Sequence, residues 1–139
     1  MSSLPLVSPD FLATYATSVN DSDQVVGYFN YFPGHGFLRN ANGSFETFDF
    51  AVEGINDGGV IVGAGPGPDD NSVGMIRIGD TNYSYTYPGA STTFLDGINN
   101  HNQVIGFYID RNNSEGIFEG QLSFVTTPSP RLYRFVPFS

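Results

Sequence analysis

Three stretches of the sequence repeat one pattern and decide the fold: Ser18-Val-Asn-Asp-Ser-Asp-Gln-Val-Val-Gly-Tyr28, Gly54-Ile-Asn-Asp-Gly-Gly-Val-Ile-Val-Gly-Ala64 and Gly97-Ile-Asn-Asn-His-Asn-Gln-Val-Ile-Gly-Phe107. In each stretch an Asn precedes a Gly by seven residues, and two branched aliphatic residues stand directly before that Gly. The repeated Asn residues lie 36 and then 43 residues apart. A repeat of this length indicates a fold built from similar supersecondary units.

Each repeat unit is predicted to form four short strands. The first strand ends at the repeated Asn, whose side chain can bond backbone N–H groups in the turn that follows. The second strand is the β-branched run, and its Gly indicates either a close approach between sheets or a β-bulge. The third and fourth strands start at a second shared Gly and at an aromatic residue, which are Gly36 and Phe45, Gly74 and Tyr83, and Gly116 and Phe124.

Four strands in about 40 residues are typical of a β-propeller blade. We therefore predict an all-β fold, a single domain over residues 1–139, with three four-stranded repeats that form propeller-like blades. The units span about 11–51, 52–90 and 91–128, and a C-terminal strand follows at 131–138. Because a propeller ring needs roughly 4–8 blades, we expect oligomerisation to complete it. The alternative is a β-trefoil, which also has three four-stranded repeats.

The connections between the predicted strands vary to different degrees. The spacing from Asn to Gly is seven residues in all three units, whereas the spacing from the second-strand Gly to the third-strand Gly is 9, 11 and 10 residues. In an up-and-down four-stranded sheet, the variable connections emerge on one face and the constant turns on the other. Variable loops on a constant scaffold are where binding residues are expected.

The segments His35-Gly-Phe-Leu38, Asn42-Gly-Ser-Phe-Glu-Thr-Phe-Asp49 and Gly54-Ile-Asn-Asp57 together resemble the bacterial extracellular repeats of the HAF family. The resemblance covers roughly residues 11–128. Only the first unit keeps the His, since Val73 and Glu115 stand at the corresponding positions. The resemblance implies a secreted, propeller-like repeat protein and implies no established reaction.

Composition narrows the partners and the compartment. The formal net charge is −9, with five Arg and no Lys, so the chain lacks the basic face that nucleic-acid binding needs. No apolar run is long enough for a membrane span, and the absence of Cys excludes disulfides and thiolate sites. The first nine residues lack the basic and apolar regions of a signal peptide. The acidity, the missing Lys and the many Asn, Ser and Thr residues favour an extracellular or cell-surface location.

Candidate ligand-binding residues lie in and around the predicted loops between second and third strands. Aromatic rings can stack on the C–H faces of sugars while Asp, Asn and Arg bond the hydroxyls, so these loops suit a glycan. The candidates are Tyr28, Tyr31, His35, Asp70, Tyr108, Asp110 and Arg111. Calcium is the candidate cofactor for acids in these loops, but no complete calcium-binding motif occurs. No residue is assigned as catalytic or as a metal ligand.

No nucleophile-elbow motif or other catalytic pattern is present, which favours a non-enzymatic function. We expect a secreted repeat module that self-assembles, with a dimer favoured. It is expected to bind an extracellular ligand, with a glycan as the candidate, or to serve as a structural surface component. One alternative is an extracellular hydrolase or lyase that uses acids of the loop face. The other is a filament subunit.

Overall fold

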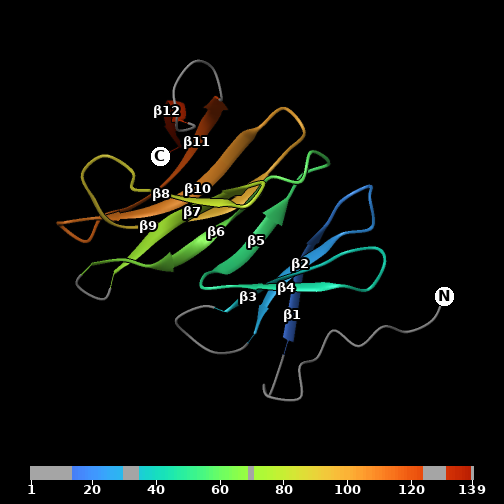
Figure 1. The fold of residues 1–139 in the computed structure, drawn as a ribbon. Helices are drawn as coiled ribbons and strands as arrows, with labels where there is room; N and C mark the ends of the chain where they lie inside the picture. The colour runs from blue at the N-terminus through green and yellow to red at the C-terminus, as the bar shows by residue number, and fades with distance from the viewer. Residues whose placement is uncertain (1–13, 30–34, 69–70, 124–130, 139) are drawn as a thin grey trace.

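The computed structural model describes residues 14–29, 35–68, 71–123 and 131–138, which form twelve strands in three antiparallel sheets (Figure 1). The prediction of an all-β protein is confirmed. The strands of each sheet follow one another in chain order, so each sheet is an up-and-down meander. Within the described residues, strands of different sheets do not pair and no closed barrel forms.

The strand bounds follow the repeat. Sheet 1 contains β1 (Thr14–Val19), β2 (Val25–Phe29), β3 (Gly36–Arg39) and β4 (Phe45–Phe48). Sheet 2 contains β5 (Ala51–Ile55), β6 (Ile61–Pro66), β7 (Ser72–Ile78) and β8 (Thr81–Tyr85). Sheet 3 contains β9 (Ala90–Ile98), β10 (Gln103–Asp110), β11 (Glu115–Ser123) and β12 (Arg131–Phe138).

The fourth strand of sheet 3 comes from the C-terminal part of the chain. β12 pairs antiparallel with β11 over Ile117–Ser123 and so completes this sheet. The fourth strand that the repeat predicts near Phe124 lies outside the described residues.

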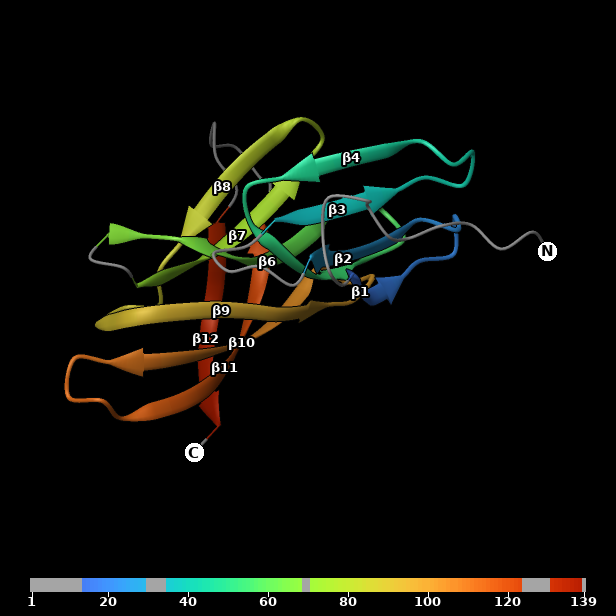
Figure 2. The ribbon, with the colours of Figure 1, turned by 90° about the horizontal axis from the view of Figure 1, so that it is seen from below.

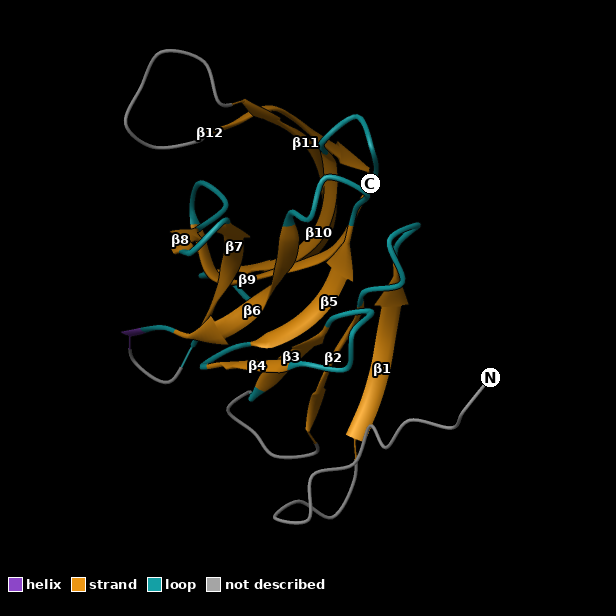
Figure 3. Cartoon of the chain, turned by 45° about the vertical axis from the view of Figure 1, so that its right-hand side comes forward, coloured by secondary structure: helices purple, strands orange, loops and turns teal. Residues whose placement is uncertain are grey.

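Successive sheets pack face to face in the same way. β5 lies against β1, β2 and β3, and β9 lies against β5, β6 and β7. Figure 2 shows β9 alongside β6 and β7. The first strands of sheets 2 and 3 therefore each cover the preceding sheet. The arrowheads of β1 and β5 point to the same end of the molecule, where the turns that follow them lie (Figure 3).

Two apolar clusters fill the spaces between the sheets. The buried residues between sheets 1 and 2 are Val26, Leu38, Phe48, Phe50, Val52, Ile55 and Ile61. Those between sheets 2 and 3 are Val60, Val62, Ile76, Leu95, Val104, Phe118 and Leu122. Tyr83, Tyr85 and Tyr87 pack against the second cluster, which their alternation in the sequence predicts.

The repeated Gly of the second strand lies opposite a β-bulge, one of the two interpretations that the sequence left open. The extra residue of the first strand is Thr17 in sheet 1, Glu53 in sheet 2 and Asp96 in sheet 3. At Gly63, a Cβ would overlap the carbonyl oxygen of Ala51 on the bulged strand. A side chain is therefore excluded where the bulged backbone crosses closest.

Candidate functional site

The constant turns between first and second strands are organised by the repeated Asn side chain. Asn20 Oδ1 accepts hydrogen bonds from the backbone N–H groups of Ser22 and Gln24, both at 3.0 Å. Asn99 Oδ1 makes the equivalent bonds at 2.9 and 3.0 Å in sheet 3. The fourth turn position has positive φ and is filled by Asp23, Gly59 and Asn102. These residue types accept this conformation most readily.

The same Asn residues join one sheet to the next. Asn20 Nδ2 donates to the backbone oxygen of Asn56 at 3.0 Å, and Asn56 Nδ2 donates to the backbone oxygen of Asn99 at 3.0 Å. We call this series the asparagine ladder. Asn20 and Asn56 are buried, at 8% and 4% exposure, so these bonds are shielded from water.

A second series of bonds runs beside the ladder, one residue further along each turn. The Asp21 N–H donates to Asp57 Oδ1 at 2.8 Å, and the Asp57 N–H donates to Asn100 Oδ1 at 2.8 Å. The side-chain hydrogen bond with Asp57 raises the pKa of the exposed Asp21 carboxyl. The backbone hydrogen bond from Asp21 lowers the pKa of Asp57. The turns of sheets 1 and 2 thus each donate through the Asn side chain and through the next backbone N–H to the turn of the following sheet, and Asn100 Nδ2 donates back to Asp57 Oδ2 at 2.8 Å.

The bulge residues of sheets 2 and 3 bring two carboxyl groups near each other on neighbouring first strands. Loss of water contact raises the pKa of Glu53, and the charge of Asp96 raises it further. Loss of water contact also raises the pKa of Asp96. The pair is an unfavourable arrangement of like charges at neutral pH.

The variable loops of sheets 2 and 3 enclose a hollow of about 360 Å³. Its polar lining comes from Asn71 after β6, Thr86 after β8, Ser91 on β9 and Arg111 after β10. Pro68, Val73 and Ala90 supply the apolar part. Connections from three places in the sequence therefore meet at one hollow, which we call the loop-face pocket.

The candidates Tyr108, Asp110 and Arg111 lie together on one hairpin but do different things. Arg111 lines the loop-face pocket. Asp110 Oδ1 accepts the N–H groups of Asn112 and Ser114, at 2.8 and 2.9 Å, and closes its own turn. The Tyr108 ring stacks on Tyr87 with 4.1 Å between centroids.

Two further candidates, Tyr28 and His35, are not among the described residues that line the loop-face pocket. Tyr28 lies on β2, where its ring packs 5.2 Å from the Tyr15 ring. Loss of water contact raises the pKa of Tyr28. His35 is exposed directly before β3, and its backbone oxygen accepts the Phe29 N–H at 2.8 Å. Tyr31 and Asp70 lie outside the described residues.

Three polar residues of the pocket were not identified from the sequence. Asn71, Thr86 and Ser91 are common loop residue types and belong to no motif. Asn71 and Thr86 lie in connections that vary between units, and Ser91 lies at the start of β9, directly after such a connection.

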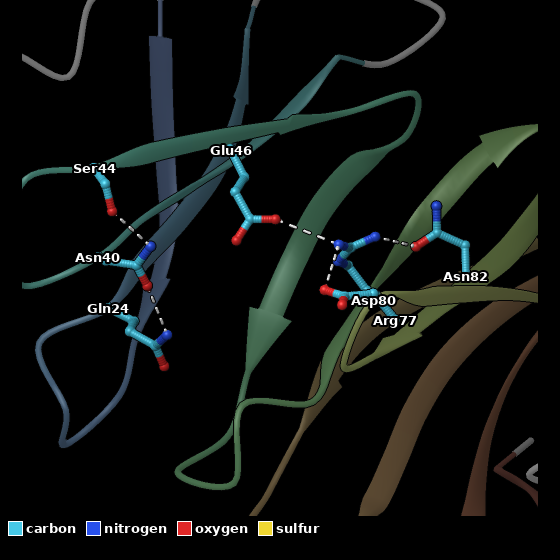
Figure 4. Close-up of polar contacts among 7 residues, drawn as sticks. All are labelled: Gln24, Asn40, Ser44, Glu46, Arg77, Asp80 and Asn82. Carbon is cyan, nitrogen blue, oxygen red and sulfur yellow. Dashed lines mark hydrogen bonds and ion pairs between the residues drawn. The ribbon is translucent and has the colours of Figure 1, made fainter.

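Other polar contacts hold the scaffold (Figure 4). Arg77 of sheet 2 donates to Glu46 of sheet 1 at 3.3 Å and to Asn82 at 3.0 Å. Its guanidinium also lies 4.7 Å from the centre of the Phe48 ring. Within sheet 1, Asn40 accepts a bond from Gln24 at 3.0 Å and so ties the two turns together.

The part of the chain that the structure describes contains no group of three or more His, Cys, Asp or Glu residues placed to hold a metal ion. None of its segments is a helix long and apolar enough to cross a membrane.

Comparison of the chain with protein-family models, with curated proteins and with solved structures finds no match. The resemblance to HAF repeats therefore depends on the quoted motifs alone.

Proposed function

We propose that the three sheets are consecutive blades of a propeller-like array and that the chain is a non-enzymatic, secreted repeat module of the HAF type. Pairing within each sheet favours this arrangement over a β-trefoil, whose barrel needs strand pairing between repeats. The face-to-face packing of successive meanders is also typical of propeller blades. The module binds an extracellular ligand at its loop face and self-assembles through its end sheets.

The loop-face pocket is the single observation that carries the binding function. It lies between two sheets, where variable connections meet, and it combines an amide, two hydroxyls and a guanidinium. Amide and hydroxyl groups suit the hydroxyls of a glycan. Arg111 forms no ion pair within the described residues, and a guanidinium binds a carboxylate through two parallel hydrogen bonds. The chemistry favours a glycan that carries uronic acid.

An enzymatic function finds less support at this pocket. Hydrolysis of a glycoside needs two carboxyl groups on opposite sides of the bond that is cleaved. The described residues that line the pocket include no carboxyl group, and the nearby Asp110 carboxylate is engaged in its own turn. Binding without reaction is therefore the function we propose.

A glycan array that includes uronate-containing oligosaccharides, followed by calorimetric titration of the best ligand, tests this function. Arg111→Ala should weaken binding by about 10-fold or more, because the carboxylate loses its charged partner. Asn112→Ala, in the same exposed turn, is the matched control and should leave the affinity unchanged. Absence of binding to every glycan, or equal affinity of the Arg111→Ala variant, contradicts the proposal. Release of shorter products would favour the hydrolase or lyase instead.

A further inference from the structure

The asparagine ladder has an unused donor end in sheet 3. Asn99 Nδ2 donates to Gln103 Oε1 at 2.8 Å, and among the described residues it makes no second bond of the kind that Asn20 and Asn56 make. The N–H of Asn100, which corresponds to the donating N–H groups of Asp21 and Asp57, also has no partner in that part of the chain. Two donors of the ladder pattern are therefore left without their equivalent acceptors at this end of the described chain.

The outer face of sheet 3 is exposed at a position that is buried in the other sheets. Val26 and Val62 each precede the second-strand Gly by one residue, and both are 0% exposed beneath the following sheet. Ile105 holds the same repeat position and is 52% exposed. Ile105 is thus an apolar residue at the position that a following sheet covers in sheets 1 and 2.

A hollow of about 370 Å³ lies around Ile105 on this face. Its lining comes from β9, β10, β11 and the turn between β9 and β10, and consists of Gly97, Ile98, Asn99, Gln103, Ile105 and Glu119. In the two joints within the chain, the first strand of the next sheet lies against the first three strands of the preceding sheet. The hollow therefore lies where a further first strand would pack. We call this face the tail.

Sheet 1 offers the complementary acceptors. The backbone oxygen of Asn20 corresponds to the oxygens of Asn56 and Asn99 that accept ladder bonds. The Asp21 carboxylate corresponds to the Asp57 and Asn100 oxygens of the second series. These acceptors lie at the end of β1, and we call this end the head.

The head also exposes an apolar residue that is buried in an equivalent joint. Val19 and Ile55 each directly precede the ladder Asn; Ile55 is 5% exposed against sheet 1, whereas Val19 is 62% exposed. Further along the same face of sheet 1, Phe37 is already fully buried. The contact surface of the head is therefore the end near the turn, where the hydrogen-bond acceptors lie.

We propose that the tail of one copy binds the head of a second copy and extends the ladder across the joint. This inference rests on the proposed propeller-like arrangement. Asn99 Nδ2 donates to the backbone oxygen of Asn20 in the second copy, and the Asn100 N–H donates to the Asp21 carboxylate of that copy. Val19 of the second copy fills the hollow beside Ile105. Two such joints close a dimer of six sheets, which is within the range of propeller rings.

Sedimentation analysis of the wild-type chain and two charge variants tests the joint. Val19→Arg disables the head and Ile105→Arg disables the tail, because each would bury an unpaired charge. Both side chains are exposed in the single chain, so each variant should keep the wild-type circular dichroism spectrum. We expect a wild-type dimer and a weakening of association by about 100-fold in either variant. The matched control is Asn112→Arg, at an exposed position in the turn between β10 and β11, away from the turn between β9 and β10. This variant should remain dimeric.

Mixing the two variants separates a head-to-tail joint from other contacts. The mixture retains one intact head and one intact tail, so it should form a 1:1 dimer through a single joint. A symmetric contact between two tails or two heads would give no such recovery and would overturn the proposal. A monomeric wild-type chain would overturn it as well, without affecting the glycan test at the loop face.

Cysteine crosslinking tests the register of the joint, because the chain contains no native Cys. Within the chain, a Cβ on Gly54 would lie 3.2 Å from the Cα of Gly97. The corresponding pair across the joint is Gly97 and Ser18 of the second copy. A mixture of Ser18→Cys and Gly97→Cys should form a mixed disulfide, and neither variant alone should crosslink efficiently. Predominant crosslinking of either variant with itself would refute this register.

A chain that carries both substitutions tests ring closure. Under oxidation it should yield a covalently closed dimer. A continuous series of longer polymers would retain the joint but overturn the closed dimer in favour of the filament.

Discussion

Substitution of Asn56 by Ala tests whether the asparagine ladder stabilises the packing of sheet against sheet. Asn56 makes three hydrogen bonds through its side chain. Nδ2 donates to the Asn99 backbone oxygen at 3.0 Å and to Asn102 Oδ1 at 2.8 Å, while Oδ1 accepts the Val60 N–H at 2.9 Å. Because Asn56 is only 4% exposed, water does not readily replace these bonds.

The expected loss can be compared with that of the exposed Asn99. One buried and two partly buried bonds at about 1 kcal/mol each, with about 1 kcal/mol for partners left unsatisfied, give a loss of about 4 kcal/mol for Asn56→Ala. Asn99→Ala also removes three side-chain bonds, at 2.8, 2.9 and 3.0 Å, but these are exposed and lie within one turn. Its loss should be about 1 kcal/mol, as for a turn or cap residue open to water.

Urea denaturation of the two variants measures this difference. Both substitutions are made in the Ile105→Arg background, so that Asn99 stays at an open end. With an m-value of about 2 kcal/mol/M, the midpoint for Asn56→Ala should lie about 1.5 M below that for Asn99→Ala. Equal midpoints, or a larger loss at Asn99, would show that the Asn side chain acts only within its own turn. The reasoning about the ladder would then be wrong.

Three further predictions test other parts of the scaffold. The pKa values of Glu53 and Asp96 are raised in the folded chain. At a pH between the ordinary and the raised pKa, the folded chain therefore binds more protons than the unfolded chain. The free energy of unfolding falls as pH rises through that range. Glu53→Gln should therefore raise the melting temperature at pH 7, and the gain should shrink as pH falls below the ordinary Glu pKa of 4.5; a gain independent of pH would contradict this. Gly63→Ala should lower the free energy of unfolding by about 2 kcal/mol or more, measured by thermal unfolding, because the added Cβ would overlap a carbonyl oxygen. The control Gly58→Ala has room for its Cβ and should change the free energy of unfolding by less than about 0.5 kcal/mol. Arg77→Met should lose about 1 kcal/mol in urea, since the partly exposed ion pair contributes little and the contact with a Phe ring adds to it; an unchanged midpoint would show that neither contact matters.

The strands and turns of this protein could be predicted because they depend on local chemistry. Asn20 and Asn99 bond N–H groups two and four residues ahead, so their turns form within a few residues. The alternation of Tyr83 and Tyr85 likewise places both rings against one core. Nothing distant is needed to specify either feature.

The bonds between sheets could not be predicted from the same residues. The acceptor of Asn20 Nδ2 lies 36 residues away, and only the packing of β5 on sheet 1 brings it near. The origin of the fourth strand in sheet 3 has a similar cause. The sequence of β12 indicates a strand but does not show which edge that strand will join.

The candidate site was predicted only in part because aromatic residues serve packing as readily as recognition. The Tyr108 ring stacks on the Tyr87 ring and packs against the core, so this packing uses the ring surface that could have stacked on a sugar. Arg111 lines the pocket because a charged guanidinium remains at the surface next to a turn. Composition can propose both residues, whereas burial distinguishes them.

The ladder explains why one spacing in the repeat is constant while others vary. Between Asn20 and Gly27, a single inserted residue would turn Val26 to the opposite face of its strand, since side chains alternate along a strand. It would also displace either the ladder bond at one end or the Gly opposite the bulge at the other. Both ends are fixed by neighbouring backbone, so the seven-residue spacing has no freedom to change. The spacing from the second-strand Gly to the third-strand Gly, in contrast, is 9, 11 and 10 residues, so the length of that connection differs from unit to unit. The constant face is thus the one that joins sheets, and the variable face is the one left to evolve a ligand site.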